Sequence, residues 1–151
     1  MRHADDIGLF MTSYDRTRVK TGIVHLGYGA FHRGHQAVYV DDYMQASGDL
    51  SWGIAAVNLR TQESAGFAAS AGAAEGYLLK TMAPNGGRQM RLVRSHTAFA
   101  DWAADRGRAE ALLSQPGVHA VTVTVTESGY FLSSDWSLNT ADPVIAAELS
   151  G

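Results

Sequence analysis

Two glycines and a Phe-His-Arg triplet follow a short apolar run near the beginning of the chain. Gly27 and Gly29 come directly after residues 22–26, GIVHL, and residues 31–33, FHR, come next. The first glycine of a Gly-x-Gly turn allows a tight bend, and the second lets the backbone approach a pyrophosphate without a Cβ in the way. The free N–H groups and the dipole at the start of a following helix attract the same phosphates. The spacing therefore favours a dinucleotide-binding turn over a plain strand-to-helix bend.

Two positions depart from the usual pattern of such a turn. The third glycine is replaced by His32, so the close packing of strand on helix must be achieved in another way. The acidic residue that usually binds the ribose 2′-OH is missing after the second apolar run, where Asn58, Leu59 and Arg60 stand. Asn58 could hydrogen-bond a ribose hydroxyl, Arg60 would favour a 2′-phosphate, and Glu63 follows. The choice between NAD and NADP therefore stays open.

A second group of polar residues follows the clearest strand pattern in the chain. Residues 118–126, VHAVTVTVT, are dominated by β-branched residues and precede Glu127. Ligands of doubly wound sheets bind at the carboxyl ends of the strands, so Thr126 and Glu127 are candidate cofactor-binding residues. Glu127 could contact the nicotinamide side or relay a proton, and a solvated turn residue is the alternative.

His32 and His35 lie three positions apart, which could place two imidazoles on one face of a helix. A metal site needs further ligands, and the sequence offers no third ligand close to these two. We therefore predict no metal site here. Arg33, near the start of the same helix, could instead make a charge-assisted contact with a phosphate.

The elements that must position these residues alternate between strand and helix. Strand patterns cover residues 22–27, 52–59 and 118–126, and helical patterns cover residues 33–46, 62–71, 98–113 and a last helix that Asp142 caps and Pro143 begins. Residues 77–82 and 88–93 flank the turn residues PNGG and predict a β-hairpin. This order predicts an α/β fold with a parallel sheet and an inserted hairpin.

Composition narrows the classes of protein that remain. The chain has 151 residues with 46% hydrophobic and 18% charged, which is enough for one globular domain. The net charge of −3 gives no reason to expect a nucleic-acid partner, and the absence of cysteine excludes disulfides and thiolate chemistry. No apolar stretch is long enough for a membrane helix and the N-terminus does not resemble a secretory signal, so we expect a cytoplasmic protein.

Residues 22–44, GIVHLGYGAFHRGHQAVYVDDYM, resemble the N-terminal signature of the mannitol dehydrogenase family, the long-chain polyol dehydrogenases. Residues 123–130, VTVTESGY, are similar to a second segment of that family. The resemblance implies a Rossmann-type parallel sheet with an inserted β-hairpin, and a C-terminal helical domain that is missing here. We therefore expect residues 1–151 to be a truncated N-terminal dinucleotide-binding domain, with residues 1–20 as an N-terminal extension.

The same resemblance implies a chemistry. Family members oxidise a secondary alcohol of a polyol, such as D-arabinitol or mannitol, to the ketose with a nicotinamide cofactor and no metal. It implies that the turn holds the pyrophosphate and that Glu127 lies near the reacting centre; the turn residues are Gly27, Gly29, Ala30, Phe31, His32 and Arg33. The family's catalytic lysine lies in the C-terminal domain, and neither Lys20 nor Lys80 has its setting.

Three functional interpretations follow. The first is the cofactor-binding part of a polyol dehydrogenase, or of a related fructuronate or tagaturonate reductase, that is inactive without the missing domain. The second is a non-catalytic nucleotide-binding module. The third is a structural α/β domain in which the glycines only turn the chain. The oligomeric state is not predicted.

Overall fold

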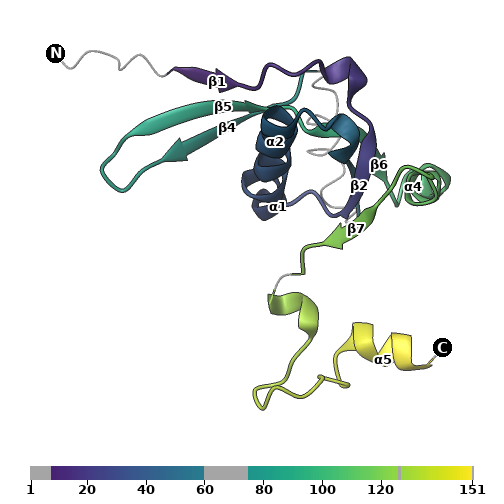
Figure 1. The fold of residues 1–151 in the computed structure, drawn as a ribbon. Coiled ribbons are helices and arrows are strands. Elements are labelled where there is room, and N and C mark those ends of the chain that lie inside the picture. The colour runs from purple at the N-terminus through teal and green to yellow at the C-terminus, as the bar shows by residue number, and fades with distance from the viewer. Residues whose placement is uncertain (1–7, 60–74, 126, 151) are drawn as a thin grey trace.

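The computed structural model describes residues 8–59, 75–125 and 127–150, and its centre is a four-stranded sheet (Figure 1). The strand order is β6-β3-β2-β7, and every neighbouring pair is parallel. These strands are β2 (Thr21–Leu26), β3 (Gly53–Asn58), β6 (His96–Asp101) and β7 (Ala120–Val123). The chain runs outward from β2 through β3 to β6 and then returns to β7 on the other side of β2. The predicted α/β fold with a parallel sheet is confirmed, and its strand order reverses between β2 and β7.

A second sheet of three strands, in the order β1-β5-β4, extends from the first (Figure 1). β4 (Tyr77–Met82) and β5 (Arg88–Val93) are antiparallel, and the Gly86 N–H donates to the Ala83 carbonyl at 2.9 Å within their turn. The predicted inserted hairpin is confirmed with its bounds. The sequence did not predict β1 (Leu9–Met11), which pairs with β5 in parallel.

The glycine turn leads into two helices. α1 spans Ala30–Gly34 and α2 spans Gln36–Ser47. The single helix predicted over residues 33–46 is therefore wrong in its start and its continuity. His35, with φ of −128° and ψ of −84°, leaves the helical region and separates the two helices. The shorter first helix begins directly at the glycine turn.

The helix predicted over residues 98–113 is wrong in its first part, because residues 98–101 belong to β6. α4 covers only Arg106–Leu113. Two aspartates explain the boundary: Asp101 Oδ1 accepts from the Ala103 N–H at 3.0 Å, and Asp105 Oδ1 caps α4 by accepting from the Arg108 N–H at 2.9 Å. Parallel pairing with β3 then outweighs the helical spacing of the apolar residues in this segment.

The last helix, α5, spans Pro143–Ser150, and Asp142 Oδ1 accepts from the Val144 N–H at 2.9 Å. The predicted cap and start of this helix are confirmed. Short 3-10 helices complete the described elements: η1 (Arg16–Arg18), η2 (Leu50–Trp52) and η4 (Glu127–Tyr130). The helix predicted over residues 62–71 lies outside the described residues. None of the helices in the described ranges has the length and apolarity needed to cross a membrane.

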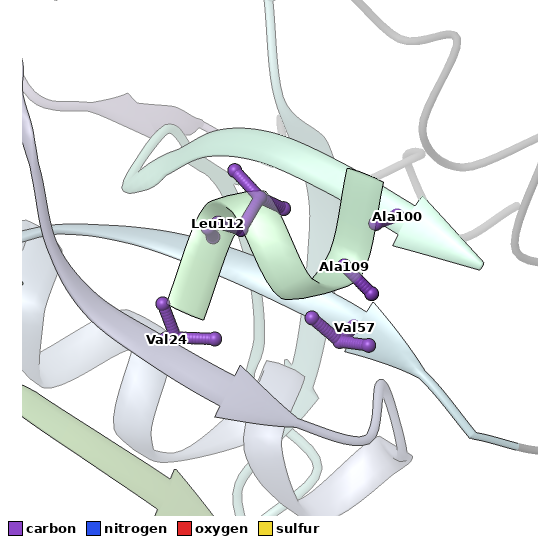
Figure 2. Close-up of a cluster of buried hydrophobic side chains, with 6 residues drawn as sticks. Val24, Val57, Ala100, Ala109 and Leu112 are labelled. Atoms are coloured by element: carbon purple, nitrogen blue, oxygen red, sulfur yellow. The ribbon is translucent and has the colours of Figure 1, made fainter. Parts of the chain in front are cut away.

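Helices cover both faces of the central sheet (Figure 1). On one face, Ala109 and Leu112 of α4 pack against apolar side chains of the sheet; these are Val24, Ala55, Val57 and Ala100 (Figure 2). On the other face, Ala37 of α2 packs against Ile23, Ile54 and Val93. Successive residues of β2 and β3 therefore face opposite layers, as expected for strands buried on both sides. This packing holds β2 and β3, whose carboxyl ends border the glycine turn, between two layers.

Candidate functional site

A crevice opens at the carboxyl ends of β2, β3 and β7, where the strand order reverses. Its volume is about 490 Å³. Residues 25–32 line one side, and Asn58, Leu59, residues 123–125 and Gly129 line the rest. Doubly wound α/β sheets bind their ligands at this position, because the loops that leave adjacent strands in opposite directions separate there.

The two glycines of the turn have different roles. Gly27 has φ of 111°, which side chains other than glycine rarely allow, and its N–H donates to the Val57 carbonyl at 2.7 Å. Gly29 precedes α1 with φ of −73° and ψ of 170°, values open to most residues, and an added Cβ would meet no atom of the described residues within 4 Å. Nothing in the part of the chain that the structure describes requires glycine at position 29. A ligand in the crevice that Gly29 lines would explain its small size.

The first turn of α1 presents backbone donors beside the crevice. The first helical hydrogen bond joins the Arg33 N–H to the Gly29 carbonyl at 3.1 Å. The preceding N–H groups, those of Ala30, Phe31 and His32, have no acceptor within an α-helix. Such groups suit an anion, because they are donors and lie at the positive end of the helix dipole.

The predicted turn residues do not all face the crevice. Ala30, Phe31 and His32 line it with the two glycines, and the Phe31 ring, 62% exposed, stacks on His35 at 4.9 Å. Arg33 does not line it. Its guanidinium lies 5.3 Å from the centre of the Tyr28 ring, so its charge makes a cation–π contact within the protein.

The remaining predicted residues come from the ends of β3 and β7. Asn58 lines the crevice, is 1% exposed, and donates from Nδ2 to Asp101 Oδ2 at 3.0 Å. Arg60 and Thr126 lie outside the described residues. Glu127 begins the 3-10 helix η4 beside the end of β7, and only its backbone is described.

Three buried histidines lie beneath the turn, between the sheet and α1. The rings of His25 and His32 stack with centroids 3.8 Å apart and an interplanar angle of 8°. His32 Nε2 lies 2.9 Å from His96 Nε2. Their exposed fractions are 3% or less. Among the described residues, no group of three or more His, Asp or Glu side chains could hold a metal ion.

The sequence interpretation missed His25 and His96 as part of this site. His25 falls within the strand pattern of residues 22–27, and strand alternation places it on the same face as Ile23. The sequence could therefore have indicated a polar cluster around His25, because a histidine in a buried strand needs a polar partner. His96 could not be found in this way, because the segment after it carried a helical pattern.

Burial lowers the pKa of each of these imidazoles below the usual value of 6.5. The pKa of His32 falls to about 4 because of burial, to which the neighbouring His25 adds. The pKa of His96 lies well below 6.5 because of burial and of the adjacent His32, and burial lowers that of His25. All three side chains are therefore neutral at pH 7, and each carries one N–H donor and one acceptor nitrogen.

The free energy of unfolding is expected to fall as the pH is lowered from 6.5 to 4. In this range the unfolded chain protonates its histidines near pH 6.5, whereas the folded chain keeps His32 neutral down to about pH 4. The unfolded state therefore binds more protons, and His32 alone would remove roughly 3 kcal/mol across the range. Urea unfolding at pH 7.5, 6.5, 5.5 and 4.5 measures the change.

A matched pair of variants separates this effect from general acid denaturation. His32→Phe should flatten the decline between pH 6.5 and 4.5. His35→Phe, at an exposed histidine, should leave the decline as it is in the unmodified chain. A free energy of unfolding that is constant between pH 7.5 and 4.5 would contradict the buried, neutral state of the cluster.

The fold and the crevice define the class of protein. A parallel sheet whose order reverses beside a Gly-x-Gly turn is a Rossmann-type α/β domain. Residues 21–150 match the family model described as the mannitol dehydrogenase Rossmann domain, and the chain belongs to this family. The family resemblance that the sequence indicated is confirmed.

Relatives of known activity lie in the same family. The chain is 35% identical over 128 residues to D-arabinitol 4-dehydrogenase of Klebsiella pneumoniae, an alignment that covers 85% of this chain and 28% of the relative. It is 33% identical over 136 residues to mannitol 2-dehydrogenase of Cereibacter sphaeroides, covering 90% of this chain and 28% of the relative. The chain thus spans less than a third of the length of these relatives.

Solved structures share the fold. The ternary complex of Pseudomonas fluorescens mannitol 2-dehydrogenase with NAD and D-mannitol matches with a TM-score of 0.79 and 26% identity, over 94% of this chain and 29% of that one. D-sorbitol dehydrogenase in substrate-free form matches with a TM-score of 0.78 and 25% identity, over 95% and 30%.

Proposed function

We propose that this chain is the cofactor-binding part of an enzyme that oxidises a secondary alcohol of a polyol to the ketose with a nicotinamide dinucleotide. The observation that carries the proposal is Gly29. It lines the crevice at the reversal of the strand order, and no atom of the described residues lies within 4 Å of the position of an added Cβ. The family membership and the similarity to an NAD complex support the proposal.

The diphosphate, a ribose and the nicotinamide each have a proposed counterpart in the chain. The backbone N–H groups of Ala30 and Phe31 would hold the diphosphate, and Asn58 at the end of β3 lies where a ribose would. Glu127, after β7, would lie on the nicotinamide side. When bound, the nicotinamide supplies the acceptor for a hydride from the substrate carbinol. We favour NAD, and a preference for NADP would point to Arg60 as the residue that binds the 2′-phosphate.

The residues of this chain bind and orient the cofactor, but they supply no base of the kind that the family uses. Removal of the hydroxyl proton needs a base within hydrogen-bond reach of the carbinol. We therefore propose that the substrate-binding and proton-accepting residues belong to a further domain, with D-arabinitol or mannitol as substrate. The cytoplasmic location stays a prediction.

Purified residues 1–151 are expected to bind NADH but not to oxidise a polyol. Fluorescence titration with NADH and NADPH measures binding, and the absorbance of NADH at pH 7 to 9 measures turnover of D-arabinitol and D-mannitol. Binding without turnover is the expected result, because hydride acceptance and proton removal would lie in different parts of the enzyme. A folded chain that binds neither nucleotide would favour the purely structural α/β domain, and turnover by this chain alone would contradict the proposed division of roles.

A further inference from the structure

A chain of hydrogen bonds runs from the buried histidines to the floor of the crevice. His32 Nδ1 lies 2.9 Å from Gln36 Oε1, and Gln36 Nε2 donates to Thr122 Oγ1 at 3.0 Å. Thr122 Oγ1 lies in turn 2.8 Å from His25 Nδ1. His25 and Thr122 are partners in the parallel register of β2 and β7, so the pairing of these two strands fixes the last contact. This series of hydrogen bonds therefore depends on the same strand pair that borders the crevice.

The direction of donation along these hydrogen bonds follows when each proton is given its nearest acceptor. An amide oxygen only accepts, so the proton of His32 is on Nδ1, and His32 Nε2 accepts from His96 Nε2–H. Because Gln36 donates to Thr122, the hydroxyl proton of Thr122 is free to bind His25 Nδ1. Its alternative acceptor, Gln36 Oε1, is 3.4 Å away. A neutral His25 that accepts at Nδ1 must carry its proton on Nε2.

The remaining N–H of His25 lies beside the glycine turn. His25 lines the crevice, and its Nε2 is 3.8 Å from the position of a Cβ on Gly27. Among the described residues, the polar contact of this nitrogen is with the Thr124 hydroxyl at 3.4 Å, which is long for a hydrogen bond. A side chain that is 1% exposed thus holds a weakly satisfied donor at the floor of the crevice. Such a donor is suited to a ligand oxygen.

We propose that His25 is a cofactor-binding residue whose Nε2–H donates a hydrogen bond to a diphosphate oxygen of the bound dinucleotide. This inference rests on the proposed function, because the turn above His25 is where the diphosphate would pass. Thr122 and Gln36 are positioning residues: they do not touch the ligand but hold the His25 proton on Nε2. Since a hydrogen bond to a charged group is stronger than one between neutral groups, its loss should be measurable as affinity.

The first experiment removes the Nε2–H donor of His25 and keeps an aromatic ring at this position. His25→Phe should weaken NADH binding about tenfold or more in fluorescence titration. His119→Phe is the control, because His119 is an exposed histidine beside Trp52, away from the crevice. Circular dichroism verifies that both variants fold. Equal NADH affinity of a folded His25→Phe variant and the unmodified chain would overturn the proposal.

The second experiment tests the positioning role. Thr122→Val should weaken NADH binding less than His25→Phe does, and the double variant should bind as weakly as His25→Phe alone. A purely structural effect of Thr122 would instead add to the loss, because independent changes are additive.

The third measurement needs no variant and no ligand. Nitrogen-15 NMR of the imidazoles should show the His25 proton on Nε2 and the His32 proton on Nδ1, and a His25 proton on Nδ1 would overturn the inference even if His25→Phe failed to fold. Failure of the unmodified, folded chain to bind NADH would instead overturn the proposed function, and with it the ligand assigned to His25. The tautomers would still report on the hydrogen-bond chain itself.

Discussion

Replacing Asp41 with alanine is expected to lower the free energy of unfolding by about 3–5 kcal/mol. Asp41 lies on α2 and is fully buried. Its carboxylate accepts from Arg91 Nη2 at 2.9 Å, from the Arg94 N–H at 3.3 Å, and from the hydroxyl of Tyr14. One carboxylate thus joins the N-terminal segment, α2 and the end of β5. Its removal would leave a guanidinium, a backbone donor and a phenol without their shared acceptor.

Asp42, the next residue, is the matched control. It also pairs with Arg91 Nη2, at 2.6 Å, but its side chain is 50% exposed. An exposed ion pair stabilises by no more than about 1 kcal/mol, so Asp42→Ala should change the free energy of unfolding little. Urea unfolding of both variants at pH 7 makes the comparison. Losses of unfolding free energy of similar size at the two positions would show that the buried contacts of Asp41 add no more stability than an exposed ion pair does.

Replacing Gly29 with valine is expected to weaken NADH binding at least tenfold while changing the free energy of unfolding by no more than about 1 kcal/mol. The backbone at Gly29 is extended and suits valine, and none of the described residues has an atom within 4 Å of the added Cβ. The loss would come from the ligand, because a branched side chain would occupy the space in which the backbone approaches the diphosphate.

Gly34→Val provides the control for this second substitution. Gly34, in α1, likewise has no described atom within 4 Å of an added Cβ, but it does not line the crevice. Its replacement should leave NADH binding intact. Gly27→Val would not serve, because φ of 111° at Gly27 would strain the fold itself. Equal NADH affinity of the Gly29→Val and Gly34→Val variants would contradict the assignment of Gly29 to the cofactor site. Titration of NADH fluorescence, with thermal unfolding of each variant, gives both quantities.

Features that depend on neighbouring residues could be predicted from the sequence. The strand over residues 22–27, the turn that follows it and the hairpin formed by residues 77–82 and 88–93 each carry their pattern within a few positions. The Asp142 cap of α5 is equally local. In these segments the turn residues and the apolar periodicity point to the same structure, so tertiary contacts did not override them.

Features that depend on contacts between distant residues could not be predicted. Residues 98–113 have apolar side chains at helical spacing, but Asp101 turns the chain and β3 provides a partner for a strand over residues 98–101. The hydrogen bond of His25 with Thr122 joins residues 97 positions apart and needs the register of β2 and β7. The cation–π contact of Arg33 likewise could not be derived from the sequence, because it depends on where the fold places the Tyr28 ring.

The exposure of the final helix affects how the protein unfolds locally. α5 contains no buried residue and lies apart from the central sheet, whereas every residue of β3 is buried (Figure 1). Amides in α5 can therefore exchange with solvent through local fraying, and those of β3 only through opening of the whole sheet. We therefore expect the two regions to open separately, so that a loss of helical signal at the C-terminus would not report on the state of the crevice.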